Sequence, residues 1–333
     1  DPLPSSALVD RDGVAKPKLA NVADRIEVLA RQYAGQGRDD IDLLAIGGNT
    51  AIADRLRELL TARGLDVAPK TGATRRHAVE VRHCGDLAGE DRYAGVRVEV
   101  LVSWSLPPAR ALERDTGAAT GLMPTRVLGE AWAVAEARLR LRDGTSYRVV
   151  RPVHPDPAVE ELRRRKTEGE MAQALGRARW TRRTAETPLD LWILSPLPLP
   201  ELGVDQVLRW GDVAVHRAEL AFWRLGGVLP CRPADLVLTG LWPTERAAEE
   251  VLKGQFPFII DTLKGNCPFK PTQTPYRRVN QKRWSMALVG AWLAPEAAAE
   301  LLRAATRTPD LIVGRPDPAP DHTPHRPAAT PPD

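Results

Sequence analysis

The chain has 333 residues, of which 43% are hydrophobic and 27% are charged, and its formal net charge is +4. This composition is typical of a folded globular protein, and the length predicts about two domains. No apolar run approaches the roughly 20 residues that a membrane-spanning helix needs, so we expect no membrane partner. Its three cysteines, Cys84, Cys231 and Cys267, lie far apart. Their spacing and odd number argue against a disulfide framework and favour a cytoplasmic location.

The most informative feature is a recurring pattern of an apolar strand, a break and then a helix rich in Ala, Leu and Glu. The break falls at or near proline in four segments and at Gly-Gly-Asn-Thr in the fifth. These segments cover residues 41–64, 98–114, 189–209, 235–253 and 286–305. The alternation of strand and helix predicts an α+β protein.

In chain order, the first half begins with Pro-rich residues 1–20, which we expect to be irregular, and an amphipathic helix over 21–33. An apolar strand is predicted at 41–46. The helix that follows it is predicted to have Thr50 as its N-cap and Gly64 as its stop signal.

Strands are predicted next at 77–82 and 96–104, followed by a helix from about Pro107. Residues 131–150 predict a β-hairpin, because two β-prone arms flank Asp143-Gly144, a typical pair for a two-residue type I′ turn. A polar, basic helix is predicted over 158–180.

The second half predicts the element order βαββαβ, which is that of a ferredoxin-like unit. Strands are expected at 236–241, 256–263, 283–292 and 311–313, helices at 244–253 and 295–305, and a loop at 265–275. The first half permits the same order. We therefore predict two ferredoxin-like units joined by a hairpin and a basic helix.

The predicted organisation has five parts. They are an irregular segment at 1–20, an N-terminal α+β unit at 21–157, a basic helical connector at 158–187, a C-terminal ferredoxin-like unit at 188–313 and a disordered Pro-rich tail at 314–333.

Positive charge is clustered, and the strongest functional candidate is a basic stretch near the C-terminus. From Lys270 to Arg283 there are five basic residues and no acidic residue. The basic residues are Lys270, Arg277, Arg278, Lys282 and Arg283, and Trp284 follows them. Arginine and lysine neutralise phosphates and aromatic rings stack on bases, so this loop predicts nucleic-acid binding.

Two short sequences in this unit resemble the motifs of the RNA-recognition-motif family. LVLTGL at 236–241 is similar to the motif on the first strand of that family, with Val237 in place of an aromatic residue. KRWSMALV at 282–289 is similar to the motif on the third strand, with Trp284 at the first aromatic position. The resemblance implies a sheet surface that holds single-stranded nucleic acid, with Trp284 as one stacking residue.

A second basic cluster lies at the end of the predicted basic helix. It consists of Arg177, Arg179, Trp180, Arg182 and Arg183. A helix that follows a phosphate backbone is one interpretation. The other is a solvated helix, which the interspersed acids favour. These acids are Glu160, Glu161, Glu168 and Glu170.

Three further candidates carry weaker signals. The Gly-Gly turn at 46–56 could hold a phosphate on the N–H groups of a helix start, or it could be a simple capped turn. Acids on predicted strands could bind Mg²⁺, although no paired-acid motif supports this. They are Asp42, Glu80, Glu99, Asp190, Asp235 and Asp261. His77, His83 and Cys84 form a compact cluster without the second ligand pair of a structural zinc site.

The leading hypothesis is a nucleic-acid-binding protein that contacts single-stranded RNA or DNA more than duplex. Phosphates would be contacted by Arg277, Arg278, Lys282 and Arg283. One alternative is a metal-dependent phosphoryl-transfer enzyme using Asp42, Asp190 or Asp235. The other is an assembly subunit with protein partners or a homo-oligomeric interface. The sequence predicts no cofactor and no metal.

Overall fold

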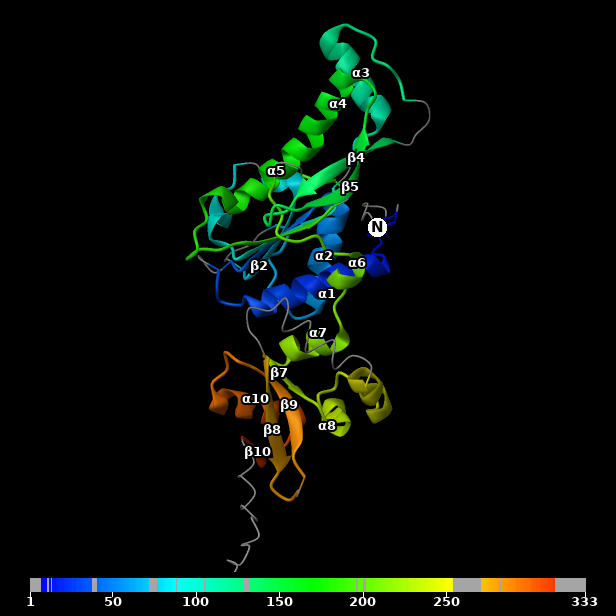
Figure 1. Cartoon of the computed structure of the whole chain (residues 1–333). Helices are drawn as coiled ribbons and strands as arrows, with labels where there is room; N and C mark the ends of the chain where they lie inside the picture. Colours follow the sequence, from blue (N-terminus) through cyan, green and yellow to red (C-terminus); the bar gives the residue numbers. More distant parts are fainter. Residues whose placement is uncertain are drawn as a thin grey trace, which may run out of the picture. The chain divides into compact units, whose positions relative to one another are not determined.

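Helices and strands are mixed throughout the chain, as the sequence predicted, and they form two compact units, Asp1–Val215 and His216–Asp333 (Figure 1). The computed structural model describes residues 7–10, 12, 14–37, 41–71, 77–87, 89–104, 106–127, 132–195, 197–199, 202–253, 271–281 and 283–314.

The first unit is built on a four-stranded parallel sheet. Its strands are β1 (Leu43–Gly47), β2 (Val79–His83), β3 (Val98–Val102) and β6 (Asp190–Leu194), and they lie in the order β2-β1-β3-β6. Counted along the chain, this order is 2-1-3-4, which is that of doubly wound α/β sheets. Parallel neighbours require crossover connections, which explains why strands and helices alternate in this part of the sequence.

Two layers cover the two faces of this sheet. Helices α1 (Pro17–Gln32) and α2 (Thr50–Ala62) pack with the valines of β3 on one face. Helix α5 (Glu170–Leu175) packs with Leu44 and Leu101 on the other face, beside short 3₁₀ turns. These turns are η3 (Cys84–Leu87), η4 (Arg92–Gly95) and η6 (Gly176–Ala178). Every residue of β1 and β3 is buried as a result.

The predicted basic helix is present as one continuous rod. It consists of α4 (Pro157–Arg164), the π-helical turn η5 (Arg165–Gly169) and α5. Asp156 caps its start by accepting hydrogen bonds from the N–H groups of Ala158 and Val159. A final 3₁₀ turn, η7 (Trp180–Arg182), leads toward β6.

The predicted hairpin is also confirmed, but its turn is of a different type. Strands β4 (Ala133–Arg140) and β5 (Ser146–Val153) pair antiparallel beyond helix α3 (Ala109–Thr120). A type I′ turn needs positive φ at both central residues, whereas at Asp143-Gly144 only Gly144 has it, at 87°. The N–H of Leu141 donates to Thr145 O at 2.9 Å, which closes a longer loop.

Several boundaries differ from the prediction. Helix α1 begins at Pro17, inside the segment 1–20 that the sequence predicted to be irregular. The N-cap of α2 is Asn49, whose side chain accepts a hydrogen bond from Ile52 N, and Thr50 is the first helical residue. The unit boundary lies after Val215 and not near residue 188, because β6 pairs with β3 and so completes the sheet of the first unit. A short helix, α6 (Trp210–Val213), precedes this boundary.

The second unit contains an antiparallel sheet in the order β10-β8-β9-β7. Its elements in chain order are α7 (Arg217–Arg224), β7 (Val228–Pro230), α8 (Pro233–Leu238), a helical stretch at 245–253, β8 (Pro271–Arg278), β9 (Ser285–Gly290), α10 (Pro295–Thr306) and β10 (Leu311–Val313). Its core packs α10 against Val228, Tyr276 and Val289.

Neither sheet has the strand arrangement of a ferredoxin-like unit. In that unit all neighbouring strands are antiparallel, and the first and third strands lie at the centre. The first sheet here is wholly parallel. The second is antiparallel, but β8 and β9 lie at its centre and β7, the first of its described strands in the chain, lies at its edge. The strand predicted at 236–241 is wrong, because α8 begins at Pro233 and has Asp235 in its first turn, both of which favour a helix start. Residues 271–275, predicted as loop, belong to β8.

Several expectations fall on residues that the structure does not describe. The strand predicted at 256–263, the tail after Gly314 and Cys267 all lie outside the described residues. Cys84 and Cys231 are free thiols. Within the described ranges, no helix has the length and apolar character needed to cross a membrane.

Candidate nucleic-acid interface

Four of the residues predicted to contact nucleic acid meet at the tip of the β8–β9 hairpin. Arg277 and Arg278 end β8, and Arg283 and Trp284 lead into β9. Antiparallel pairing up to Tyr276 and Ser285 holds the two arms together. The other two residues of this first basic cluster, Lys270 and Lys282, lie outside the described residues.

Arg278 is tied to the helix α8. Its Nη2 donates to Asp235 Oδ1 at 3.1 Å, and the hydroxyl of Tyr276 donates to Asp235 Oδ2 at 2.7 Å. The Asp235 side chain is 2% exposed, so these two donors compensate a buried carboxylate. Burial and the charge of Asp235 raise the pKa of Tyr276, which keeps its hydroxyl proton. Arg278 therefore joins α8 to the hairpin, and its charge is balanced by that of Asp235.

Arg277 lies over the ring of Trp284. Its guanidinium carbon is 4.9 Å from the ring centroid, and its Nη1 donates to Gln281 O at 3.2 Å. This cation–π contact occupies one face of the indole, so a base has no access to that face while Arg277 stays in place. A guanidinium carries five N–H groups, so this hydrogen bond leaves Arg277 with donors to offer a ligand.

A third arginine reaches the hairpin tip from α8. Arg232 is the N-cap residue of α8, and its Nη1 donates to Gln281 Oε1 at 3.3 Å. The sequence prediction missed Arg232 because it assigned a strand to 236–241 and so expected no helix that begins at Pro233. Arg283 is exposed and has no hydrogen bond or ion pair with the described residues. Among the described residues of this tip, the cations that can contact a ligand without breaking an ion pair are thus Arg232, Arg277 and Arg283.

Among the described residues, two helices lie between β7 and the hairpin in the chain. Helix α8 ends at Leu238, and Gly240 turns the chain with a φ of 76°. Thr244 caps the next helix, since its Oγ1 accepts from Ala247 N at 3.2 Å. The helix at 245–253 carries three glutamates and two cations, so its own charge is negative. These are Glu245, Glu249, Glu250, Arg246 and Lys253.

The second predicted basic cluster is largely engaged within the first unit. Arg179 pairs with Asp91. Arg183 donates from Nε to Ala178 O and from Nη2 to Val96 O, both at 2.9 Å. Arg182 is exposed, and Arg177 is half-buried with no partner at its Nε among the described residues. Arg179 and Arg183 thus join the connector to Asp91 and Val96 of the same unit.

The most buried arginine of the connector is also structural. Arg163 has a fully buried side chain and pairs with Glu160 and Glu168, both at 2.8 Å. Arg163 Nη1 also donates to Thr167 Oγ1 at 3.2 Å. The charge of Arg163 is therefore neutralised inside the fold. A count of basic residues in this helix thus overstates the positive charge at its surface.

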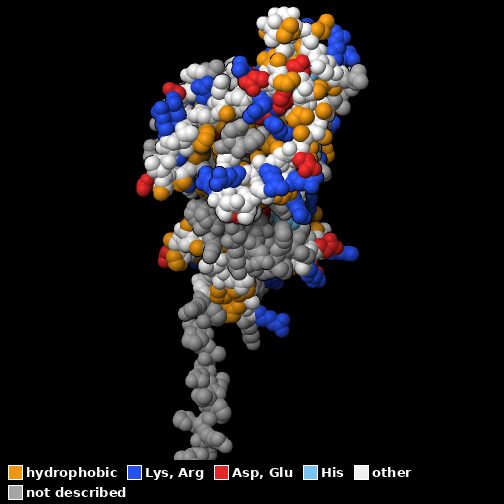
Figure 2. Space-filling model, turned by 45° about the horizontal axis from the view of Figure 1, so that its top comes forward, with side chains coloured by type: hydrophobic (Ala, Val, Ile, Leu, Met, Phe, Trp, Pro, Cys, Tyr) orange, Lys and Arg blue, Asp and Glu red, His pale blue; other side chains and the backbone are white. Residues whose placement is uncertain are grey.

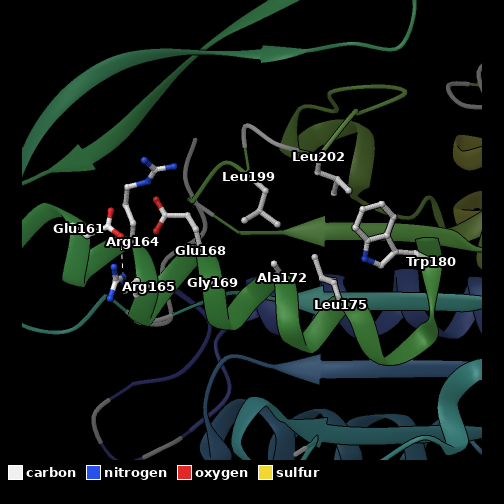
Figure 3. Close-up of a pocket in the computed structure, with 10 residues that line it drawn as sticks. All are labelled: Glu161, Arg164, Arg165, Glu168, Gly169, Ala172, Leu175, Trp180, Leu199 and Leu202. Atoms are coloured by element: carbon white, nitrogen blue, oxygen red, sulfur yellow. Dashed lines mark hydrogen bonds and ion pairs between the residues drawn. The ribbon is translucent and has the colours of Figure 1, made fainter. Parts of the chain in front are cut away.

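Trp180 lines a groove of about 510 Å³ beside the α4–η5–α5 rod. Figure 3 shows it near Leu175 and Leu202 at the apolar end of the groove, while Arg164 and Arg165 lie at the other end. The indole thus lies apart from Arg164 and Arg165 at the charged end of the groove.

The charge of the visible surface is also divided. On the face shown in Figure 2, Lys and Arg side chains form separate patches with Asp and Glu side chains among them. On this face, contact with a polyanion would therefore involve local clusters and not one continuous field.

The Gly-Gly turn after β1 is closely packed. Gly48 N donates to Val102 O at 3.0 Å, and a Cβ on Gly48 would lie 2.6 Å from Ser103 O. Asn49 uses its side chain to cap α2. Glycine is needed here for the close approach of two backbones, and this observation gives no support to a phosphate site.

The candidate metal-binding acids are separated and already have protein partners. Asp42 accepts from Gly35 N and Gly37 N, and Asp190 accepts from the Tyr33 hydroxyl. Asp235 and Glu80 are paired as well, and Asp261 lies outside the described residues. His77, His83 and Cys84 also form no joint site. Across the described part of the chain, no group of three or more His, Cys, Asp or Glu residues could hold a metal ion.

Glu99 is the exception among these acids. Its side chain is fully buried in β3, and neither carboxylate oxygen has a hydrogen-bond partner among the described residues. Burial raises the pKa of Glu99 well above its ordinary value, and the positive charge of Arg183 opposes this shift only in part. Glu99 is therefore a candidate for a neutral buried acid and is unsuited to binding a cation.

Comparison of the chain with protein families, with curated proteins and with solved structures found no match.

Proposed function

We propose that the chain binds nucleic acid through the β8–β9 hairpin of its second unit, with Arg232, Arg277 and Arg283 contacting phosphates. The observation that supports this most is the convergence of these three cations from two elements on one hairpin tip, next to Gln281. Arg278 and Asp235 neutralise each other, so they add no net charge there. Clustered, accessible guanidinium groups are the usual phosphate contacts of nucleic-acid-binding proteins.

Duplex is the preferred partner in this proposal, whereas the sequence favoured a single strand. The described elements run helix, strand, helix, helix, strand, strand, with β7 antiparallel to β9. This is the connectivity of winged helix-turn-helix modules, an analogy of fold alone. A single-strand platform needs free aromatic faces, and Arg277 covers one face of Trp284.

The hairpin and not the helix at 245–253 carries the phosphate contacts in this proposal. The excess of glutamates on that helix would be repelled by a phosphate backbone. The arginines of the hairpin tip have no acidic residue among the described residues 277–284 beside them.

The test is fluorescence anisotropy of the full chain with labelled duplex DNA, single-stranded DNA and duplex RNA over a salt series. The Arg277→Ala/Arg283→Ala variant leaves the Arg278–Asp235 pair intact. We expect it to lower duplex affinity roughly tenfold or more and to reduce the salt slope by about 2. The matched control, Arg217→Ala/Arg246→Ala, removes two exposed charges of the same unit and should bind as the native chain does.

Three results would overturn the proposal. They are an absence of binding near physiological salt, binding that the hairpin variant does not change, and a loss confined to the control variant. The last result would place the phosphate contacts on α7 or on the helix at 245–253. A clear preference for single strands would restore the interpretation made from the sequence.

The enzymatic alternative has no supporting arrangement of carboxylates among the described residues. The assembly alternative stays a proposal, for which the oligomeric state in solution is the test.

A further inference from the structure

The β4–β5 hairpin is a two-stranded ribbon with one open face. Within the described part of the chain, its two strands pair only with each other, over eight residues each, from Ala133–Val153 to Arg140–Ser146. Pairing places alternate residues on opposite faces. One face has every strand residue exposed except the half-buried Pro152, while most strand residues of the other face are half-buried. The exposed residues are Val134, Glu136, Arg138, Arg140, Ser146, Arg148 and Val150.

Both ends of the ribbon are attached to the first unit. At the turn, Arg142 N donates to Val204 O at 2.9 Å, and Leu141 forms a parallel bridge with Val204. At the base, the buried His154 contacts Glu113 Oε1 of α3 through its Nε2 at 3.3 Å. A two-stranded ribbon is only marginally stable by itself, so these attachments hold it in a defined place with its outer face open.

Repulsion between the arginines on this face destabilises the ribbon. Arg138 and Arg148 are directly opposite each other in the register, and Arg140 is the next residue on the same face. Like charges directly opposite one another destabilise an antiparallel pair. Glu136 pairs with Arg148 and offsets part of this repulsion. Arg138 and Arg140 have no ion pair or hydrogen bond with any described residue through their side chains.

We propose that the outer face of the β4–β5 ribbon is a second binding surface for duplex nucleic acid, separate from the β8–β9 hairpin. This inference rests on the proposed function for the identity of the partner. A polyanion supplies the counter-charge that Arg138 and Arg140 lack among the described residues. The exposed side chains of Val134 and Val150, 68% and 55% accessible, flank these arginines.

The ribbon has dimensions that allow it to enter the major groove of duplex DNA. Two strands lie about 4.8 Å apart and eight residues extend about 27 Å. The major groove of B-form DNA is about 12 Å wide and admits a two-stranded β-ribbon. Arg138 and Arg140 are about 6.8 Å apart along their strand, so both can reach phosphates bordering one groove.

The experiment compares Arg138→Gln/Arg140→Gln with Arg110→Gln/Arg114→Gln in the full chain. The control residues are exposed on α3 of the same unit, so both variants lose the same charge. We expect the ribbon variant to lower affinity for duplex DNA by roughly tenfold and the salt slope by about 2, and the control to leave both unchanged. The Arg138→Lys/Arg140→Lys variant should retain the native salt slope. Far-ultraviolet circular dichroism and thermal unfolding verify that each variant is folded.

The outcomes separate this inference from the proposed function. If only Arg277→Ala/Arg283→Ala weakens binding, the hairpin site stands and the ribbon proposal is overturned. If only the ribbon variant weakens binding, the ribbon is supported and the hairpin site is overturned. If both do so and their losses add, both surfaces are supported. An equal loss of binding to phosphatidylserine vesicles would overturn the assignment to a duplex groove, and an absence of any nucleic-acid binding would overturn both proposals.

Discussion

The two arginine-bearing hairpins differ in how the fold uses similar side chains. The tip of β8–β9 belongs to a four-stranded sheet, and α8 supplies Asp235 to pair with Arg278. The β4–β5 ribbon has only two strands, and Arg138 on its outer face has no protein partner among the described residues. In sequence, both are arginines around a turn. The elements packed on a strand therefore decide whether its arginines stabilise the fold or stay available to a ligand.

The largest expected effect is a difference in stability between an arginine substitution in the β8–β9 hairpin and one in the β4–β5 ribbon. Arg278→Ala leaves Asp235 buried with only the Tyr276 hydroxyl as a donor, and should lower the free energy of unfolding of the second unit by about 2–4 kcal/mol. Arg138→Ala on the open ribbon should change stability by less than about 0.5 kcal/mol. Urea unfolding of the full chain measures both.

A double-mutant cycle verifies the cause. Asp235→Asn combined with Arg278→Ala should cost less than the sum of the single changes, because neither charge is left alone. Equal effects of Arg278→Ala and Arg138→Ala would show that the two hairpins do not differ in this way.

A second prediction extends the comparison from Asp235, which has two donors, to Glu99, which has none among the described residues. The pKa of Glu99 is raised by burial, so the native state binds more protons than the unfolded state above the ordinary pKa of a glutamate, about 4.3. Stability is fully retained below that pH and falls as the pH rises toward the raised pKa. Glu99→Gln should therefore be more stable than the native chain at pH 8 by on the order of 1 kcal/mol.

This difference should shrink as the pH approaches 4, and thermal unfolding from pH 4 to 8 records it. The control is Glu58→Gln, which changes a glutamate whose side chain is 62% exposed on α2. A pH profile of Glu99→Gln that parallels the native one would contradict the assignment of a neutral Glu99.

The smallest expected effect concerns the ribbon alone. Glu136→Gln removes the partner of Arg148 and leaves it opposite Arg138. Local stability of β4–β5 should fall by about 0.3–1 kcal/mol, with the loss disappearing near 1 M salt. Amide hydrogen exchange in the ribbon measures this, since a two-stranded arm can open locally.

The same substitution should strengthen duplex binding, because it adds one net positive charge to the outer face. Unchanged exchange and unchanged affinity together would show that Glu136 does not balance the arginines. The Glu90→Gln variant, which alters a half-buried acid paired with Arg92, is the matched control.

Local structure was predicted well from the sequence. The apolar run at 41–46, the hairpin at 131–150 and the helix at 295–305 all correspond to elements of the structure. Hydrophobic periodicity and turn residues act over a few neighbouring positions, so they are visible without the fold. The run at 236–241 failed because a short apolar segment suits a strand or a buried helix equally, and contacts with distant β8 are part of what distinguishes them.

Residue order alone was enough to show that helices and strands alternate, where most of them lie, and that arginines gather in a few places. Tertiary contacts were needed to show that β6 joins the first sheet, that the sheets are wholly parallel and wholly antiparallel, and which arginines are engaged. Strand pairing and ion pairs such as Arg278–Asp235 join residues far apart in the chain. Their free energy depends on burial and on the partner that folding brings close, and neither is encoded in the spacing of a local motif.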